Sequence, residues 1–320
     1  RSMGFAKGER IAIQSENRSE WTMTDYACAH LGYVSVTVYP TLTPEQIAYI
    51  LNDSETSMVV VSTMEQAEKI KAIKKRVKSL RAMVILDNEP ADEDWIFSMA
   101  DVMQKGKKHK ADTGQNLEAE GKKISPDDLW TIIYTSGTTG DPKGVMLSQF
   151  NIASDVQAAQ HHLNFQTGKR WLSFLPLSHS LEREVSHLTF WVGSTTYIAE
   201  SVLKVPDNLK EARPHYFVSV PRLYEKIYGK IMSGVAAGSP MKRKIFNWAK
   251  DIGSLTAREY LQKNKKPTGS LAMKYALAKK LVFSKIMNAF GGEFIFGISG
   301  GAPLPRTICE FFAAAGIIIL

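Results

Sequence analysis

Short apolar segments alternate with amphipathic segments over the first 86 residues of the chain. The apolar segments are rich in β-branched residues and end at glycine, proline or polar residues, a pattern typical of buried strands. The segments between them predict helices over Glu20–Tyr33, from Thr43 onward, and over Glu65–Leu80. Strands and helices that alternate at this spacing favour right-handed crossovers between parallel strands. The predicted strands are Gly8–Gln14, Val34–Val38, Met58–Val61 and Ala82–Leu86.

The length of the chain indicates more than one such unit. Its 320 residues are 44% hydrophobic, which is ample for a large core. We expect an α/β fold of two packed αβα subdomains with mostly parallel sheets, residues 1–164 and residues 165–320. The second is expected to begin near Thr167–Arg170, and the polar stretch Asp87–Lys123 to be a surface excursion with little core.

The most unusual stretch is Tyr134-Thr135-Ser136-Gly137-Thr138-Thr139-Gly140-Asp141-Pro142-Lys143-Gly144. Glycines let a backbone approach a ligand closely, and hydroxyls, amides and a lysine suit phosphate oxygens. The composition alone also fits a polar surface loop. A Walker loop is excluded because Pro142 precedes the lysine and Gly144 follows it. The loop is expected to join two strands, since Val145–Leu147 reads as a strand before a helix capped by Ser148.

Two later stretches also carry candidate chemistry. His179 lies in Leu175–Arg183, after a predicted strand, where ligands of α/β sheets collect. A packed core histidine is the alternative, and a metal site with Glu182 and His187 lacks recognised zinc spacing. Gly297–Leu304 contains the G-x-S-x-G pattern of α/β hydrolases. No histidine follows it in this sequence, so the hydrolase interpretation fails.

These three stretches together resemble the adenylate-forming superfamily. The Tyr134–Gly144 loop is similar to the family signature that grips the ATP phosphates. Leu175–Arg183 is similar to a second signature in its long-chain fatty acyl form, and Gly297–Leu304 to the adenine-binding segment. From Gly4 to Leu320 the chain resembles the N-terminal domain of a long-chain fatty acyl-CoA synthetase.

The resemblance implies a set of site residues. Thr135 is the implied magnesium ligand, Lys143 a supporting catalytic cation, and His179 the residue at the junction of the acyl carboxylate and the α-phosphate. The implied phosphate-binding residues are Ser136, Gly137, Thr138, Thr139 and Gly140. The implied adenine-binding residues are Gly300, Gly301, Ala302 and Pro303.

The resemblance also implies a two-step reaction. A fatty carboxylate attacks the α-phosphorus of ATP and releases pyrophosphate, and the thiol of coenzyme A then displaces AMP from the acyl-adenylate. The family's Tyr-Gly-x-Thr-Glu motif, its ribose-binding aspartate and the C-terminal domain with its lysine would follow Leu320. We therefore expect a truncated chain that supplies an ATP and acyl half-site and is weakly active or inactive alone. The alternatives are the adenylation domain of another carboxylate-activating enzyme, such as a peptide synthetase, or a nucleotide-binding or membrane-associated fragment without ligase activity.

Charge and cysteine content bear on partners and location. Met241–Lys285 contains twelve lysine or arginine residues and two acidic residues, whereas the net charge of the whole chain is +8. Apolar residues at helical spacing in this stretch leave two interpretations, a solvated helix face and a peripheral contact with anionic membrane. Nucleic acid is not expected, because no recognised binding motif accompanies the charge. Two distant cysteines, no signal-peptide pattern and no apolar run of transmembrane length favour a cytoplasmic protein.

Overall fold

The computed structural model describes residues 1–87, 93–135, 140–263 and 265–320, so Ser136, Gly137, Thr138 and Thr139 lie outside the described residues. Its contacts form two compact units. The first comprises residues 1–164 and 176–188, and the second comprises residues 165–175 and 189–320. Residues 176–188, which the sequence division places in the second subdomain, pack with the first unit because Leu177 and Arg183 are buried there.

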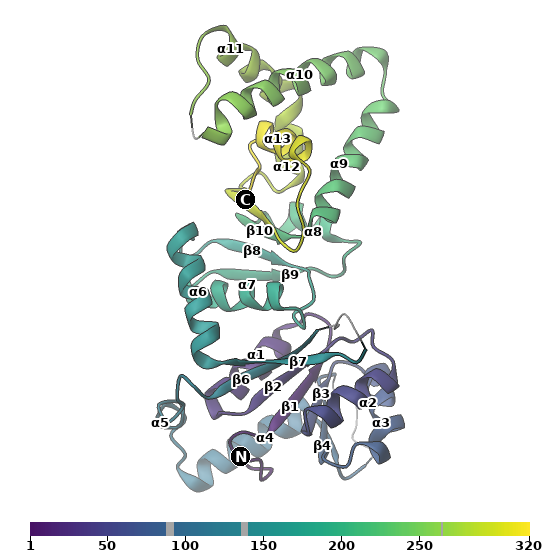
Figure 1. Cartoon of the computed structure of the whole chain (residues 1–320), viewed down its shortest axis with the longest axis vertical. Coiled ribbons are helices and arrows are strands. Elements are labelled where there is room, and N and C mark those ends of the chain that lie inside the picture. The colour runs from purple at the N-terminus through teal and green to yellow at the C-terminus, as the bar shows by residue number, and fades with distance from the viewer. Residues whose placement is uncertain (88–92, 136–139, 264) are drawn as a thin grey trace. The chain divides into compact units, whose positions relative to one another are not determined.

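The first unit is built on a seven-stranded sheet with the strand order β5-β4-β3-β1-β2-β6-β7 (Figure 1). All neighbouring strands are parallel except β6 and β7, which are antiparallel. The mostly parallel α/β fold expected from the sequence is confirmed. The strands are β1 (Arg10–Gln14), β2 (Val34–Val38), β3 (Thr56–Val61), β4 (Ala82–Ile85), β5 (Ile96–Ser98), β6 (Leu129–Thr135) and β7 (Lys143–Ser148).

Helices cover both faces of this sheet. Alternate residues of each strand point to opposite faces, so Ala12 and Val59 join one core cluster while Ile11 and Val60 join another. The helices α2 and α3 pack on the first face, and α1 and α4 on the second. The helices of this unit are α1 (Ser19–Leu31), α2 (Pro44–Asp53), α3 (Met64–Ile73), α4 (Met99–Thr113), α5 (Leu117–Gly121), α6 (Gln149–Leu163) and, as far as Leu188, α7 (Ser180–Trp191).

The local signals at helix starts are confirmed. Thr43 and Gln46 form a capping box at α2, with Pro44 at its first position. Ser148 and Asn151 form another at α6. Each box satisfies backbone N–H groups that the first helical turn leaves without a partner.

Two expectations in this unit are wrong. The helix expected over Glu65–Leu80 ends at Ile73, followed by a 3-10 turn at Lys74–Arg76. The segment expected to be a surface excursion contains β5, which pairs with β4, and the fifteen-residue helix α4. The strand escaped detection because three residues are too few to show alternation. The expectation of little core is met in α4, which has no buried residue.

The second unit is built on a five-stranded parallel sheet with the order β12-β11-β10-β8-β9. Its core gathers aromatic side chains of strands and helices, among them Phe217, Tyr224, Phe311 and Phe312. The strands are β8 (Arg170–Ser173), β9 (Thr195–Ile198), β10 (Tyr216–Ser219), β11 (Phe296–Ser299) and β12 (Ile318–Ile319). The helices are α8 (Val205–Ala212), α9 (Pro221–Ala236), α10 (Pro240–Glu259), α11 (Gly269–Ala278), α12 (Ser284–Ala289) and α13 (Arg306–Ala314), with a 3-10 turn at Leu261–Lys263 and a π-helical turn at Lys279–Phe283.

Candidate functional site

The ends of the glycine-rich loop are held together by the antiparallel pair β6–β7. Thr135, the last residue of β6, lies opposite Lys143, the first residue of β7, and both are exposed. The loop therefore joins strand to strand, as expected, whereas a Walker loop runs into a helix. Gly140, the first described residue after the gap, has φ +113°, a conformation that only glycine adopts readily.

Gly144 is required where the loop returns to the sheet. A Cβ atom at this position would lie 2.7 Å from Cγ2 of Ile132 and 3.1 Å from the ring of Tyr134. Both contacts are shorter than side chains tolerate without moving. The glycine thus lets β7 lie close to β6 directly behind Lys143.

Two tyrosine hydroxyls tether the base of the loop to α2. The Tyr134 hydroxyl donates to Oδ2 of Asp53 at 2.6 Å, and the Tyr49 hydroxyl donates to the carbonyl of Pro142 at 3.2 Å. Burial and the neighbouring Asp53 carboxylate raise the pKa of Tyr134, so its proton stays in this hydrogen bond at neutral pH. One tether lies near the end of β6, and the other lies directly before the start of β7.

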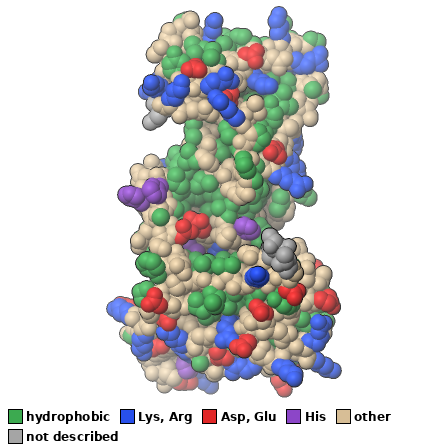
Figure 2. Space-filling model, viewed as in Figure 1, with side chains coloured by type: hydrophobic (Ala, Val, Ile, Leu, Met, Phe, Trp, Pro, Cys, Tyr) green, Lys and Arg blue, Asp and Glu red, His purple; other side chains and the backbone are tan. Residues whose placement is uncertain are grey.

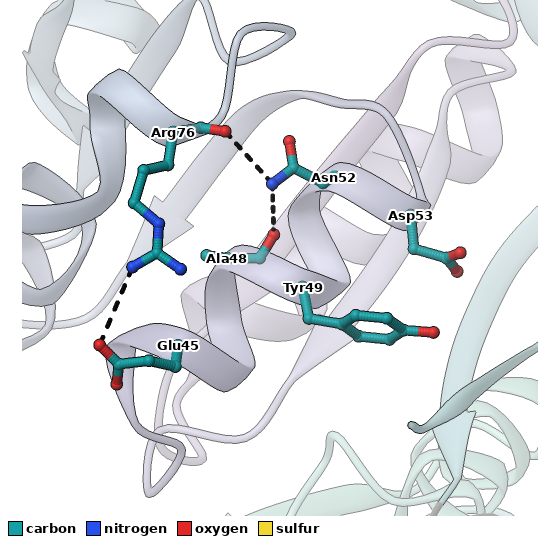
Figure 3. A pocket seen from close by; sticks show the side chains of 6 residues that line it. All are labelled: Glu45, Ala48, Tyr49, Asn52, Asp53 and Arg76. Carbon is teal, nitrogen blue, oxygen red and sulfur yellow. Dashed lines mark hydrogen bonds and ion pairs between the residues drawn. The ribbon is translucent and has the colours of Figure 1, made fainter. Parts of the chain in front are cut away.

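The helix α2 also lines an open pocket of about 510 Å³ (Figure 3). Asn52 donates from Nδ2 to the carbonyls of Ala48 and Arg76, and Arg76 lies 3.9 Å from a carboxylate oxygen of Glu45. The contacts with Arg76 link α2 to the 3-10 turn at Lys74–Arg76. The pocket is lined by Glu45, Ala48, Tyr49, Asn52, Asp53 and Arg76.

The segment before His179 is fastened to the carboxyl end of β2. The Leu177 N–H donates to Oδ1 of Asn17 at 2.9 Å. The Ser178 hydroxyl donates to the carbonyl of Val38 at 3.2 Å, and the Thr37 hydroxyl donates to the carbonyl of Ser178 at 3.1 Å. The two bonds of Ser178 attach this non-helical segment to the last two residues of a buried strand, and the bond from Leu177 attaches it to the segment between β1 and α1.

This attachment brings His179 to the same sheet edge as the loop. Thr37 of β2 pairs with Ile133 of β6, two residues before Thr135. The carboxyl ends of parallel strands meet at one edge, where α/β sheets bind ligands. His179 is exposed at this edge, and its Nδ1 accepts a hydrogen bond from the Leu181 N–H at 3.2 Å. A neutral imidazole that accepts at Nδ1 carries its proton on Nε2 and can donate from there.

A buried ion pair lies one helical turn beyond His179. Arg183 and Asp25 both have 1% side-chain exposure, and Nη2 of Arg183 lies 2.5 Å from Oδ1 of Asp25. The Nε atom of Arg183 also donates to Oδ2 of Asp25 at 3.1 Å. Two further guanidinium N–H groups donate to the hydroxyls of Ser35 and Thr131. The pair therefore joins α7 to α1 and to strands β2 and β6.

His187 completes this network in its neutral form. Its Nε2 lies 3.7 Å from Oδ2 of Asp25, and its Nδ1 is 3.0 Å from the Tyr26 hydroxyl. Burial and Arg183 lower the pKa of His187 to about 4 against the opposing effect of Asp25. The Trp130 indole N–H donates to Asp25 at 3.2 Å. Asp25 and Arg183 are 158 positions apart in the sequence, and no local pattern marks such a pair.

The candidate adenine-binding residues lie in the second unit. Gly300, Gly301, Ala302 and Pro303 follow β11 at the carboxyl end of the second sheet. The Gly300 N–H donates to the carbonyl of Ser219, the last residue of β10, at 2.9 Å. Gly301 has φ +82°, and Gly301 to Pro303 are exposed, so the backbone here is accessible to a flat ligand. The structure thus groups the loop and His179 in one unit and this segment in the other.

The described residues offer a magnesium ion little protein coordination. Within residues 1–87, 93–135, 140–263 and 265–320, no group of three or more histidine, cysteine, aspartate or glutamate side chains could hold a metal ion. Thr135 presents one exposed hydroxyl at the end of β6. A single hydroxyl suits an ion held mainly by phosphate oxygens and water, which is how magnesium commonly binds beside nucleotides.

Comparisons with known proteins place these features in context. The family described as AMP-binding enzyme matches residues 1–320. Long chain acyl-CoA synthetase 6, peroxisomal, of Arabidopsis thaliana is 31% identical over 309 residues, covering 96% of this chain and 42% of that protein. Long-chain-fatty-acid–CoA ligase 5 of Rattus norvegicus is 32% identical over 324 residues, covering 95% of this chain and 44% of that protein. The chain spans less than half the length of these two curated relatives.

Solved structures share the fold. The N-terminal domain of FACL13 from Mycobacterium tuberculosis superposes with a TM-score of 0.67 at 20% identity, over 99% of this chain and 63% of that chain. A long-chain-fatty-acid-CoA ligase from Archaeoglobus fulgidus gives a TM-score of 0.67 at 19% identity, over 98% of this chain and 50% of that chain.

Proposed function

The chain belongs to the AMP-binding enzyme family, and from this premise we propose that it forms the ATP- and acyl-binding part of a long-chain fatty acid–CoA ligase. The observation that carries the proposal is the shared sheet edge, where β6 enters the glycine-rich loop beside the attachment point of His179. The similarity to long-chain acyl-CoA synthetases over nearly the whole chain supports the substrate class. The substrates would be a fatty acid, ATP and coenzyme A, in a cytoplasmic setting.

The first chemical step brings a carboxylate to a polyphosphate, so the site must offset charge repulsion. We assign Ser136, Gly137, Thr138, Thr139 and Gly140 to the β- and γ-phosphates and Lys143 to a supporting charge. Donors fixed in advance of the reaction stabilise the developing charge without reorganising. The tethers from Tyr134 to Asp53 and from Tyr49 to Pro142 hold the two ends of that loop.

His179 would act where the two substrates meet. With its proton on Nε2, the ring can donate to an oxygen of the carboxylate or of the α-phosphate. Thr135 is the proposed ligand of a magnesium ion, which would supply positive charge to the phosphates. Gly300, Gly301, Ala302 and Pro303 would contact adenine through exposed backbone. The division of the chain into domains of residues 1–164 and 165–320 remains a prediction.

Exchange of labelled pyrophosphate into ATP tests the proposal. For an enzyme that contains this chain, we expect exchange to require a long-chain fatty acid and to be absent with amino acids. The control replaces the fatty acid by the alcohol of equal length, which has no carboxylate to activate. Exchange supported by amino acids instead would favour the alternative of a peptide-synthetase adenylation domain. If no carboxylate supported exchange but ATP still bound, the result would favour the alternative of a nucleotide-binding fragment without ligase activity.

A contact with membrane is a second candidate, favoured by one surface of the second unit. Met241 at the start of α10 is 67% exposed and Met273 in α11 is 77% exposed. Figure 2 shows lysine and arginine side chains on the part of the second unit where Figure 1 draws α10 and α11. Exposed apolar side chains among cations suit an anionic lipid surface. None of the helices in the described ranges combines the length and apolarity needed to cross a bilayer.

Liposome sedimentation tests this contact. We expect the chain to sediment with vesicles that contain anionic lipid in low salt and to be released in high salt, because salt screens surface charge. Vesicles of neutral lipid are the control. Equal sedimentation with neutral and anionic vesicles would contradict an electrostatic contact, and no sedimentation with either would favour a solvated helix face.

A further inference from the structure

An apolar cavity of about 480 Å³ lies in the first unit, beneath α4. Its floor is the sheet face formed by Ile11, Val60 and Val84, and Cys28 of α1 forms part of one wall. Val102 of α4 lies on the opposite side. This is the face of the sheet covered by α1 and α4, and none of the described residues at the proposed ATP site lines the cavity. The volume is in the range of pockets that hold small organic ligands.

The packing of α4 agrees with a space beneath it. The helix runs for fifteen residues from a well-formed capping box at Ser98, yet none of its residues is buried. Its apolar residues Met99 and Val102 point toward the cluster that contains Val60 and Val84, but they are only partly buried. A surface helix normally buries its apolar face against the core. Here that face packs only partly on the core, and the cavity lies between the helix and the sheet.

The charged residues at this cavity are all basic. Lys107 and Lys110 of α4 line it and are exposed, and Arg1 lines it as well. Among the described residues, no aspartate or glutamate lines it. An apolar chamber with cations at its margin is complementary to a molecule with an alkyl chain and one anionic head group.

The geometry points to a binding site for a single-chain anionic amphiphile, of the class of a medium- or long-chain carboxylate, between α4 and the sheet. The alkyl chain would lie against Ile11, Val60 and Val84, and the head group would meet Lys107 and Lys110. This site is separate from the proposed ATP and acyl half-site and does not depend on that function. A fatty acid would thus have two places to bind on this chain.

Titration calorimetry with octanoate, decanoate and dodecanoate below their micelle concentrations tests the site. We expect each added methylene to tighten binding about fourfold until the cavity is filled, because burying one methylene contributes about 0.8 kcal/mol. Dodecyl phosphate serves as a second anionic head group and dodecanol as the neutral one. Equal affinity for dodecanol and dodecanoate would overturn the role of the lysines.

A larger side chain at Ala27 would fill the cavity from the surface of α1. Ala27 is exposed on α1 and lines the cavity, so Ala27→Trp adds bulk without replacing a core side chain. We expect at least a tenfold loss of dodecanoate affinity, whereas Ala236→Trp at an exposed position of α9 leaves it unchanged. Unchanged affinity in a folded Ala27→Trp protein would overturn the site. His179→Ala should leave this affinity unchanged, which separates the cavity from the proposed acyl site.

The lysines and Cys28 give two further readouts. Lys107→Glu with Lys110→Glu should weaken dodecanoate at least tenfold but dodecanol less than twofold, and Lys230→Glu on α9 is the matched control. In a Cys309→Ser background, dodecanoate should slow alkylation of Cys28 by N-ethylmaleimide, since this thiol lines the cavity. Dodecanoate that binds without protecting Cys28 would overturn the location even if Ala27→Trp failed to fold.

Discussion

Asparagine in place of Asp25 is expected to lower the free energy of unfolding of the first unit by about 3–5 kcal/mol, the usual cost of leaving one member of a buried ion pair without its partner. The substitution preserves shape but removes the charge that faces the buried Arg183 guanidinium. The hydrogen bonds to Ser35 and Thr131 remain, but neither hydroxyl neutralises the cation. Urea denaturation followed by circular dichroism measures the loss, and the fluorescence of Trp21 and Trp130 reports on the network directly.

Two control variants distinguish the effect of the lost charge from a general loss of stability. Glu118→Gln removes one side of an exposed ion pair with Lys122, and we expect a change below about 0.5 kcal/mol. Asp25→Leu combined with Arg183→Met removes both charges, and we expect it to cost less than Asp25→Asn alone. A loss below about 1 kcal/mol for Asp25→Asn would contradict the importance of the pair.

The same network gives a pH dependence with a definite sign. The pKa of His187 is about 4 in the folded protein and near 6.5 when the chain is unfolded. Between these values the unfolded chain binds the extra proton, so stability is full above pH 6.5 and falls as the pH drops toward 4. Arg183→Met removes a cation that lowers the pKa of His187, so that pKa should rise. Titration of His187 by NMR measures its pKa in the folded parent protein and in the Arg183→Met variant.

His179→Ala is expected to reduce adenylate formation by about 10²–10³-fold in an enzyme that contains this chain, equivalent to about 3–4 kcal/mol for one transition-state donor. The side chain is exposed and its backbone is held independently by the bonds at Leu177 and Ser178, so folding should change little. Pyrophosphate exchange and thermal unfolding measured on the same preparation distinguish chemistry from stability.

His161→Ala is the matched control for this substitution. His161 is an exposed histidine on α6 in the same unit, and we expect exchange to be unchanged when it is replaced. Near-normal exchange by His179→Ala would remove this residue from the proposed mechanism. A comparable loss in both variants would indicate a general effect of removing surface imidazoles.

The parts of the fold that sequence reasoning predicts are those set by local chemistry. The alternation of apolar and amphipathic segments indicates that the first strands are parallel, and Thr43 and Ser148 mark helix starts through bonds three residues away. The strands on either side of the glycine-rich loop follow from the apolar runs that flank it, whereas their antiparallel pairing is seen only in the structure. Short elements such as β5 carry too little pattern, and only its pairing with β4 defines it.

The features that the sequence does not predict depend on contacts between residues that are far apart in the chain. Nothing near Asp25 indicates an arginine partner, because Arg183 arrives from a helix that follows a strand of the other unit. The attachment of Ser178 to Thr37 and Val38 likewise joins segments about 140 positions apart. These contacts decide where His179 lies, so the sequence indicates the histidine but not its place in the site.

The path of the chain through the two units has a consequence for synthesis on the ribosome. The chain leaves the first unit at residue 164, builds β8 in the second, and returns with residues 176–188 before leaving again. A nascent chain that ends at residue 164 would hold Asp25 in an apolar setting without its cation. The first unit can therefore complete its core only after residue 188 has emerged, when the residues of β8 have been synthesised but its partner strands β9 and β10 have not. Co-translational folding of this protein is thus interleaved, with neither unit finishing before the other has begun.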